Sequence, residues 1–202
     1  MAGGVAILVE SRCRTIRCQP WPWEEGAVKR KMVRLLAAMV ALVTIGVGTN
    51  WLCLQRPVSH ALSQDPRNDG ITAWIHYQYG VNPRRVVFDL REISASKSRA
   101  DVFRVLLQFA ESQKDRHYRS VILSCRGEPK FLIPGDYFRT LGEEYDFQNP
   151  VYTMRTFPYE ITTIDGQPVF QPPQGGLLYV LGVEIEDFTE FHDRWYMDEM
   201  PL

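Results

Sequence analysis

Two apolar segments of this sequence end in polar side chains that could bind a ligand or take part in chemistry. Asp89 and Arg91 lie at the end of the first segment, and Cys125 and Arg126 lie at the end of the second. If both segments are parallel strands of one sheet, these ends form the edge at which ligands bind. We therefore take Asp89, Arg91, Cys125 and Arg126 as candidate binding residues. The alternative is that Asp89 and Arg126 pair or cap locally and that Cys125 is a small buried side chain.

Catalytic and metal-binding patterns do not accompany these residues. A nucleophilic cysteine needs a nearby base, and no histidine stands close to Cys125 in the sequence. The acidic residues lack the spacing of a calcium loop, and Gly175–Gly176 lacks that of a phosphate loop. The four histidines lack the spacing of a metal site: His60, His76, His117 and His192. We therefore expect no catalytic residue, no metal and no cofactor.

Residues 84–125 carry the pattern of two strands joined by a helix. The segments 86–90 and 121–125 are short, β-branched and aromatic, as buried strands are. Between them, Ser98 is a plausible N-cap with Asp101 three residues on, and apolar residues then recur at helical spacing as far as Lys114. A strand, helix, strand order of this length predicts a βαβ unit. The fold class is therefore α/β (or α+β), with a small mixed sheet packed with helices.

The remaining segments of the domain are assigned from local patterns. We expect a short helix over Ile71–Tyr79, a hairpin strand over Lys130–Ile133 and a short helix from Pro134 to Tyr145. Val151–Phe157 is predicted as a strand, and Asp165–Gly166 as a two-residue hairpin turn.

The last predicted helix runs from Leu177 to about Asp198. Six residues are spaced as a helical seam that would face the core: Leu178, Leu181, Ile185, Phe188, His192 and Trp195.

An uncharged apolar segment precedes the domain, from Leu35 to Leu54. As a helix its 20 residues would span about 30 Å, the thickness of a bilayer core. Its length favours a retained transmembrane anchor. The alternative is a signal peptide cleaved near Ala61, which would give a secreted product. Basic residues just before the segment predict a cytoplasmic N-terminus at the plasma (inner) membrane and a domain outside it: Lys29, Arg30, Lys31 and Arg34.

The predicted domains are a basic segment over 1–34, the transmembrane or signal helix over 35–54, a linker over 55–70 and a globular extracytoplasmic domain over 71–202. Met32 offers an alternative start that would leave residues 1–31 untranslated. Residues 62–202 carry 15 basic and 21 acidic residues, a net charge of −6. An acidic domain repels a phosphate backbone, which argues against nucleic-acid binding.

Two functions remain as hypotheses. The first is a membrane-tethered interaction or accessory module without catalysis, whose partner is another membrane or envelope protein. The alternative is a small hydrolase or transferase with a cleft at the ends of strands 86–90 and 121–125. An enzyme would gather Asp89, Cys125 and a histidine in one pocket. An interaction module would instead expose a contiguous apolar or aromatic patch.

Overall fold

The computed structural model describes residues 24–200, so the predictions made for residues 1–23 lie outside the described residues. The chain divides into two compact units, Met1–Leu42 and Val43–Leu202. The described residues of the first unit are helical and belong to α1 (Glu24–Asn50), which continues into the second unit. The helix from Val28 to Ser63 is long and apolar enough to cross a membrane, a property that signal sequences share.

The segment that follows α1 is helical and does not form the predicted linker. A π-helical stretch, η1 (Trp51–Gln55), leads into α2 (Arg56–Ser63). Pro57 lies in the first turn of α2, where a missing N–H breaks no helical hydrogen bond. Leu54 and Val58 are four residues apart, so they lie on one helical face, and both are fully buried in the core. A short 3₁₀ helix, η2 (Pro66–Asn68), completes the region.

A five-stranded mixed sheet forms the centre of the second unit, with its strands in sequence order. Among the strands of residues 24–200, only β2 and β3 are parallel, and α3 connects them, which confirms the predicted βαβ unit. The other neighbouring pairs are antiparallel. The strands are β1 (Ile71–Gln78), β2 (Asn82–Ile93), β3 (Ser120–Cys125), β4 (Glu128–Pro134) and β5 (Thr162–Thr163).

The crossover helix α3 (Arg99–Ser112) begins as the sequence predicts. The Ser98 hydroxyl accepts a hydrogen bond from the Asp101 backbone N–H, and the Asp101 carboxylate accepts one from the Ser98 N–H. This reciprocal capping box satisfies two donors that the first turn would leave unpaired. It fixes the start of a helix that contributes seven residues to the core.

Two predicted elements are wrong in type. The segment predicted as a helix over Ile71–Tyr79 instead forms β1, which ends at Gln78, because its residues pair with β2 across a tight turn. Val151–Phe157 was expected to be a strand, but the structure has α5 (Pro150–Thr156) there. Asn149 caps this helix through a hydrogen bond from the Val151 N–H, and Pro150 occupies its first position.

The predicted β4 hairpin and the helix after it are confirmed. α4 (Gly135–Glu143) buries Phe138 and Leu141, and it packs against α3. A Cβ atom at Gly142 would lie 2.4 Å from the carbonyl oxygen of Ala110 in α3, so this close approach requires glycine. Later in the chain, the Asp165–Gly166 turn closes a short hairpin at β5, as predicted.

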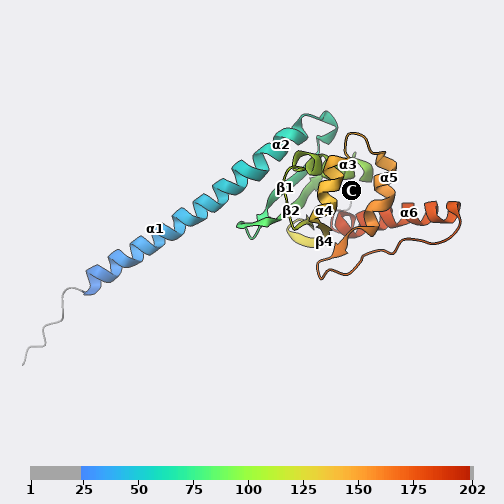
Figure 1. Ribbon diagram of the computed structural model, residues 1–202. Coiled ribbons are helices and arrows are strands. Elements are labelled where there is room, and N and C mark those ends of the chain that lie inside the picture. Colours follow the sequence, from blue (N-terminus) through green and yellow to red (C-terminus); the bar gives the residue numbers. More distant parts are fainter. Residues whose placement is uncertain (1–23, 201–202) are drawn as a thin grey trace, which may run out of the picture. The chain divides into compact units, whose positions relative to one another are not determined.

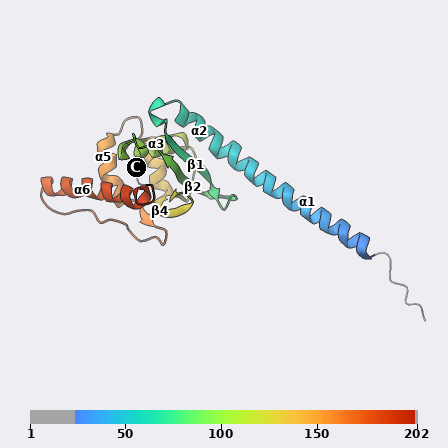
Figure 2. The same ribbon diagram turned by 180° about the vertical axis from the view of Figure 1, so that it is seen from behind.

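The last helix faces the core over only half of its length. α6 (Leu177–His192) continues into the π-helical η4 (Asp193–Met197). Phe188, His192 and Trp195 of the predicted seam are buried, whereas Leu178 and Ile185 are exposed. Figures 1 and 2 show that the first turns of α6 extend past α5 and away from the sheet, which accounts for the exposure of Leu178.

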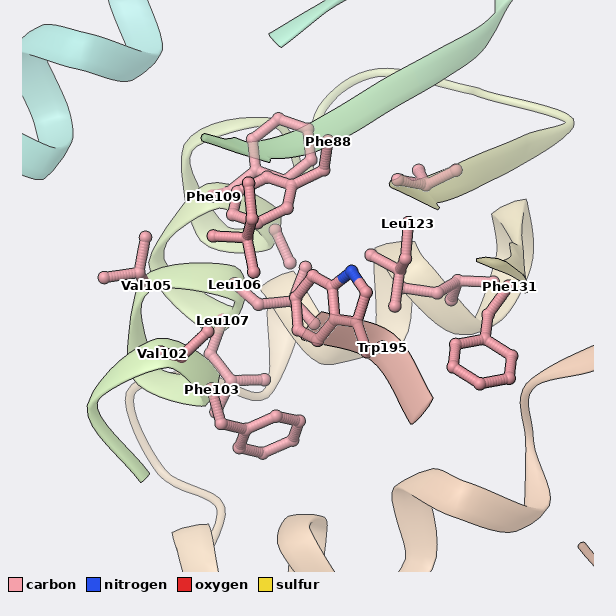
Figure 3. Packing of buried hydrophobic residues seen from close by; sticks show 14 of the residues in the cluster. Phe88, Val102, Phe103, Val105, Leu106, Leu107, Phe109, Leu123, Phe131 and Trp195 are labelled. Carbon is pink, nitrogen blue, oxygen red and sulfur yellow. The ribbon is translucent and has the colours of Figure 1, made fainter. Parts of the chain in front are cut away.

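The core lies between one face of the sheet and the helices. Phe88 of β2 stacks on Phe109 of α3 with ring centroids 5.3 Å apart, and Trp195 lies 6.0 Å from Phe88. Figure 3 shows the Trp195 indole between the side chains of α3 and Leu123 of β3. The C-terminal segment therefore closes the core that the βαβ unit begins.

Candidate functional site

The strand ends bring Asp89 and Arg91 together. Asp89 is fully buried, and its Oδ1 accepts a hydrogen bond of 2.9 Å from the backbone N–H of Gly127. Its Oδ2 lies 2.5 Å from the Arg91 guanidinium. Arg91 also lies over the indole of Trp74, 5.0 Å from the ring centroid. The Asp89 carboxylate therefore fixes the β3–β4 turn and holds Arg91, which is the local role that we weighed against ligand binding.

Cys125 lies at the end of β3 and is fully buried in the core. Burial, together with a hydrogen bond to the Glu199 carboxylate, raises the pKa of its thiol to about 12. Glu199 in turn forms an ion pair with Lys130 of β4. A thiol with this pKa is protonated at neutral pH and is a poor nucleophile.

Arg126 stands in the tight turn between β3 and β4, with a left-handed backbone (φ 50°) and an exposed side chain. Its guanidinium donates a hydrogen bond of 3.0 Å to the backbone oxygen of Glu199. Nearby, the Trp195 indole N–H donates one to the backbone oxygen of Ser124. The C-terminal segment thus covers the strand ends at which the sequence places a cleft.

His192 is the buried histidine of the described chain. Neither ring nitrogen has a hydrogen-bond partner there, and burial together with the charge of Arg99 lowers its pKa to about 3. The rings of five residues surround it: Phe103, Phe188, Phe191, Trp195 and Tyr196. It is therefore a neutral core residue. Within residues 24–200, no three His, Cys, Asp or Glu residues gather as metal ligands.

An exposed apolar surface lies on the first turns of α6, and the sequence analysis missed it. We call it the α6 surface, and it consists of Leu177, Leu178, Tyr179 and Ile185. Leu178 is 85% exposed and Ile185 62%. They are seven residues apart and so lie on one face of the helix, about 10 Å from each other along its axis. A heptad pattern does not reveal which end of a helix leaves the core, so the sequence could not find this surface.

Polar contacts hold α6 in place behind this surface. The Arg155 guanidinium of α5 forms an ion pair of 2.6 Å with Glu184, which is nearly buried. The Tyr159 hydroxyl donates a hydrogen bond of 2.8 Å to the Asp187 carboxylate. These contacts fix the second and third turns of α6, so the α6 surface is presented by a helix that is anchored to the domain.

A groove opens between the helix over residues 47–55 and strand β1, all within the second unit. It has a volume of about 410 Å³. We call it the β1 groove, and it is lined by Val47, Asn50, Trp51, Gln55, Trp74, Ile75, His76, Tyr79 and Gly80.

Two side-chain amides in the lining of this groove bind the backbone of β1. Asn50 Oδ1 accepts a hydrogen bond of 2.8 Å from the Tyr77 N–H, and Gln55 Oε1 accepts one of 2.8 Å from the Ile75 N–H. The helix is therefore hydrogen-bonded to the outer edge of the sheet.

Comparison with known proteins found no matching family model, no matching curated protein and no matching solved structure.

Proposed function

We propose that this chain is a single-pass membrane protein whose C-terminal domain lies outside the cytoplasm and binds another membrane or envelope protein, without catalysis. The α6 surface is the observation that carries the binding part of the proposal. Leu178 and Ile185 are large apolar side chains on a well-anchored helix, and each leaves most of its area in water. Burying such side chains against a partner is favourable in proportion to the apolar area removed from water.

Contacts at the end of the apolar helix support a retained anchor over a cleaved signal peptide. Leu54 and Val58 are part of the core, and Asn50 and Gln55 bind the backbone of β1. Cleavage near Ala61 would remove all four residues from the domain. A secreted product would therefore lack part of its own core, whereas an anchored protein keeps it.

Basic residues support the proposed topology. Four of them lie just before the apolar segment, whereas only Arg56 lies close after it, with Arg67 further along. Positive charge before the segment favours an N-terminus that stays in the cytoplasm. The residues before the segment are Lys29, Arg30, Lys31 and Arg34.

The alternative, a hydrolase or transferase at the strand ends, finds less support. Asp89 binds the Gly127 N–H and the Arg91 guanidinium, and neither partner is a histidine. The raised pKa of Cys125 keeps its thiol protonated. These contacts support structural roles for Asp89 and Cys125 over the roles of a base and a nucleophile.

A photo-crosslinking experiment tests the binding part. The full-length chain would carry a benzoylphenylalanine at position 179 or 185, with position 190 as the control on the same helix, and would be irradiated in intact cells. We expect one discrete adduct from positions 179 and 185, and its loss when Leu178→Glu is added. Equal adducts from all three positions, or none from 179 and 185, would contradict the proposal.

A reporter experiment tests the membrane part. Alkaline phosphatase, which folds in an oxidising compartment, would be fused after Leu202. We expect an active reporter that fractionates with the membrane at full length. A soluble product shorter by 61 residues would instead establish cleavage after Ala61. An inactive, soluble, full-length product would overturn the membrane address altogether.

A further inference from the structure

The turn between β1 and β2 presents apolar side chains where polar ones are usual. Tyr79 is 86% exposed and Val81 is 74% exposed. Tyr79 and Gly80 both have positive φ, at 56° and 74°. Such turns favour asparagine, aspartate and glycine, so tyrosine in this conformation is uncommon. Figure 1 shows this turn extending beyond the body of the sheet.

Asn50 hydrogen-bonds the β1–β2 turn and so determines the position of the turn along the helix axis. Its Nδ2 donates a hydrogen bond of 2.7 Å to the Gly80 carbonyl oxygen, while its Oδ1 binds the Tyr77 N–H. The exposed apolar side chains of the second unit's helical start run from Val43 and Val47 past Asn50 to Trp51 and Leu52. A helix that leaves the bilayer core near Leu52, two residues beyond Asn50, therefore brings Tyr79 and Val81 close to the boundary of that core.

Two tryptophans lie beside the turn. Trp51 and Trp74 line opposite sides of the β1 groove, and each keeps about half of its surface exposed. Indole and phenol rings concentrate at the boundary between hydrocarbon and headgroups, because they combine an apolar ring with a polar group. Trp51, Trp74 and Tyr79 thus form an aromatic set of the kind that membrane interfaces favour.

Arg56 lies beyond Trp51 along the chain, on the side away from the apolar helix. Arg56 lies over the Trp51 ring, 5.8 Å from its centroid, and four residues beyond Leu52, or about 6 Å along a helix. The headgroup layer on each side of a bilayer is about 5–7 Å thick. The Arg56 guanidinium therefore reaches the level of the lipid phosphates, which are its natural hydrogen-bond acceptors.

A second pair of arginines lies on the sheet near the β1–β2 turn. Arg84 and Arg119 are exposed, and the Arg119 N–H donates a hydrogen bond of 2.7 Å to the Arg84 carbonyl oxygen. Arg84 stands three residues after Val81, about 10 Å along an extended strand. No ion pair is found for either side chain within the described residues 24–200. Their charges are thus available to anionic headgroups.

We propose that the β1–β2 turn, together with Trp51 and Trp74, inserts into the headgroup region of the phospholipid bilayer, and that lipid occupies the β1 groove. The inference rests on the proposed function, since it takes the apolar helix as a membrane anchor, and it adds that the domain is seated on the bilayer surface. The groove's apolar lining fits acyl chains, and the arginines fit phosphates. Both ligand groups come from the same phospholipid molecules.

The test measures the depth of single fluorescent labels in the full-length protein. Cys13, Cys18 and Cys53 are replaced by serine, and the buried Cys125 is kept. The environment-sensitive dye NBD is attached in turn to Tyr79→Cys, Val81→Cys and Trp74→Cys. The protein is reconstituted in vesicles of phosphatidylcholine and phosphatidylglycerol, with nitroxide lipids that carry the quencher on the headgroup or high on the acyl chain.

Two further labels separate the outcomes. Asp165→Cys labels the turn of the hairpin at β5, on the opposite edge of the sheet from β1. Val43→Cys labels the apolar helix itself, seven residues before Asn50. Circular dichroism of every labelled protein shows whether it is folded, and a misfolded variant leaves the other two test positions to decide.

We expect blue-shifted emission and at least twofold stronger quenching at positions 79, 81 and 74 than at 165. Quenching at 43 without quenching at 79, 81 and 74 would overturn this inference and leave the proposed anchor intact. A lack of quenching at 43 would overturn the anchor and the inference with it. Protection of 79 and 81 that persists in detergent without lipid would identify a protein contact and also overturn the inference.

Discussion

The side-chain oxygen of Asn50 accepts a hydrogen bond of 2.8 Å from the backbone N–H of Tyr77. Tyr77 belongs to β1, the edge strand of the sheet, whose outward N–H groups have no neighbouring strand. Gln55 binds the Ile75 N–H in the same way, two residues along the strand. Two helix side chains therefore replace the strand that would otherwise complete this edge, and they protect it from pairing with another chain.

We predict that Asn50→Ala loosens this edge. The variant leaves the Tyr77 N–H and the Gly80 carbonyl oxygen without their partner, at a cost of about 1–3 kcal/mol in the free energy of unfolding. Hydrogen exchange of the β1 amides in the full-length protein should become at least tenfold faster. Gln174→Ala, in the exposed loop before α6, is the control and should change neither quantity. Unchanged exchange in Asn50→Ala would show that the amide does not hold β1.

A second prediction compares two side chains of α6. Phe188 is buried and packs on Phe103, with ring centroids 5.2 Å apart, so Phe188→Ala should cost about 3–5 kcal/mol. Ile185, three residues earlier, is exposed, and Ile185→Ala should stay within about 0.5 kcal/mol of the wild type. Urea unfolding of the two variants measures the difference. Similar costs for both would mean that α6 packs on the domain in another register.

The third prediction concerns the thiol of Cys125. The pKa of this thiol is higher in the folded protein than in the unfolded chain. As the pH rises, the unfolded chain therefore loses the thiol proton from about pH 9, whereas the folded protein keeps it until about pH 12. The stabilisation that this group gives is therefore complete below pH 9 and is lost as the pH rises toward 12. Cys125→Ala should flatten this part of the stability profile. At pH 7, a Cys13, Cys18 and Cys53 triple serine variant should react with Ellman's reagent only as fast as it unfolds, and rapid labelling would reopen the enzymatic alternative.

The fourth prediction concerns acid stability. The pKa of His192 is lowered from 6.5 to about 3 in the folded protein. Between these two pH values, the imidazole is protonated in the unfolded chain and neutral in the folded one. Stability is therefore present above pH 6.5 and is lost as the pH falls, by about 1.4 kcal/mol per unit. Urea unfolding at pH 7 and pH 5 should differ by about 2 kcal/mol in the wild type. His192→Phe, which suits the surrounding aromatic rings, should remove most of this difference, and an equal difference in both proteins would contradict a buried neutral imidazole.

Local signals predicted the centre of the fold well. Ser98 and Asp101 define the start of α3 because a capping box needs only those two residues at that spacing. The buried strands β2 and β3 also follow from continuous β-branched runs. In both cases the information lies within a few neighbouring residues, so no tertiary contact was needed to find it.

The wrong predictions concern segments whose residues are compatible with both a helix and a strand. Ile71–Tyr79 is aromatic and was taken as a helix closed by Gly80, whereas Gly80 with its positive φ closes a hairpin. The content of Val151–Phe157 suggested a strand, and the stronger signal was the Asn149 cap followed by Pro150. Turn and cap residues were thus more informative here than apolar content.

The sequence predicts that Asp89 and Arg91 lie close together, but it does not predict the contacts that Cys125 and Arg126 make with distant residues. Asp89 and Arg91 are brought together by strand alternation, which a sequence reveals. The contacts of Cys125 and Arg126 with Glu199 join residues more than 70 positions apart. Pairing at that separation depends on how η4 packs across the strand ends, and nothing in the local sequence specifies it.

The position of Trp195 determines when the domain can finish folding. Each strand of the sheet pairs with the next one along the chain, so the sheet can assemble in the order of synthesis. Trp195 packs beside Phe88, which stands 107 residues earlier in the chain. The sheet can therefore form while one side of its core is still open to water, and the domain closes only once η4 has been synthesised. Loss of η4 leaves a sheet that is formed but not sealed.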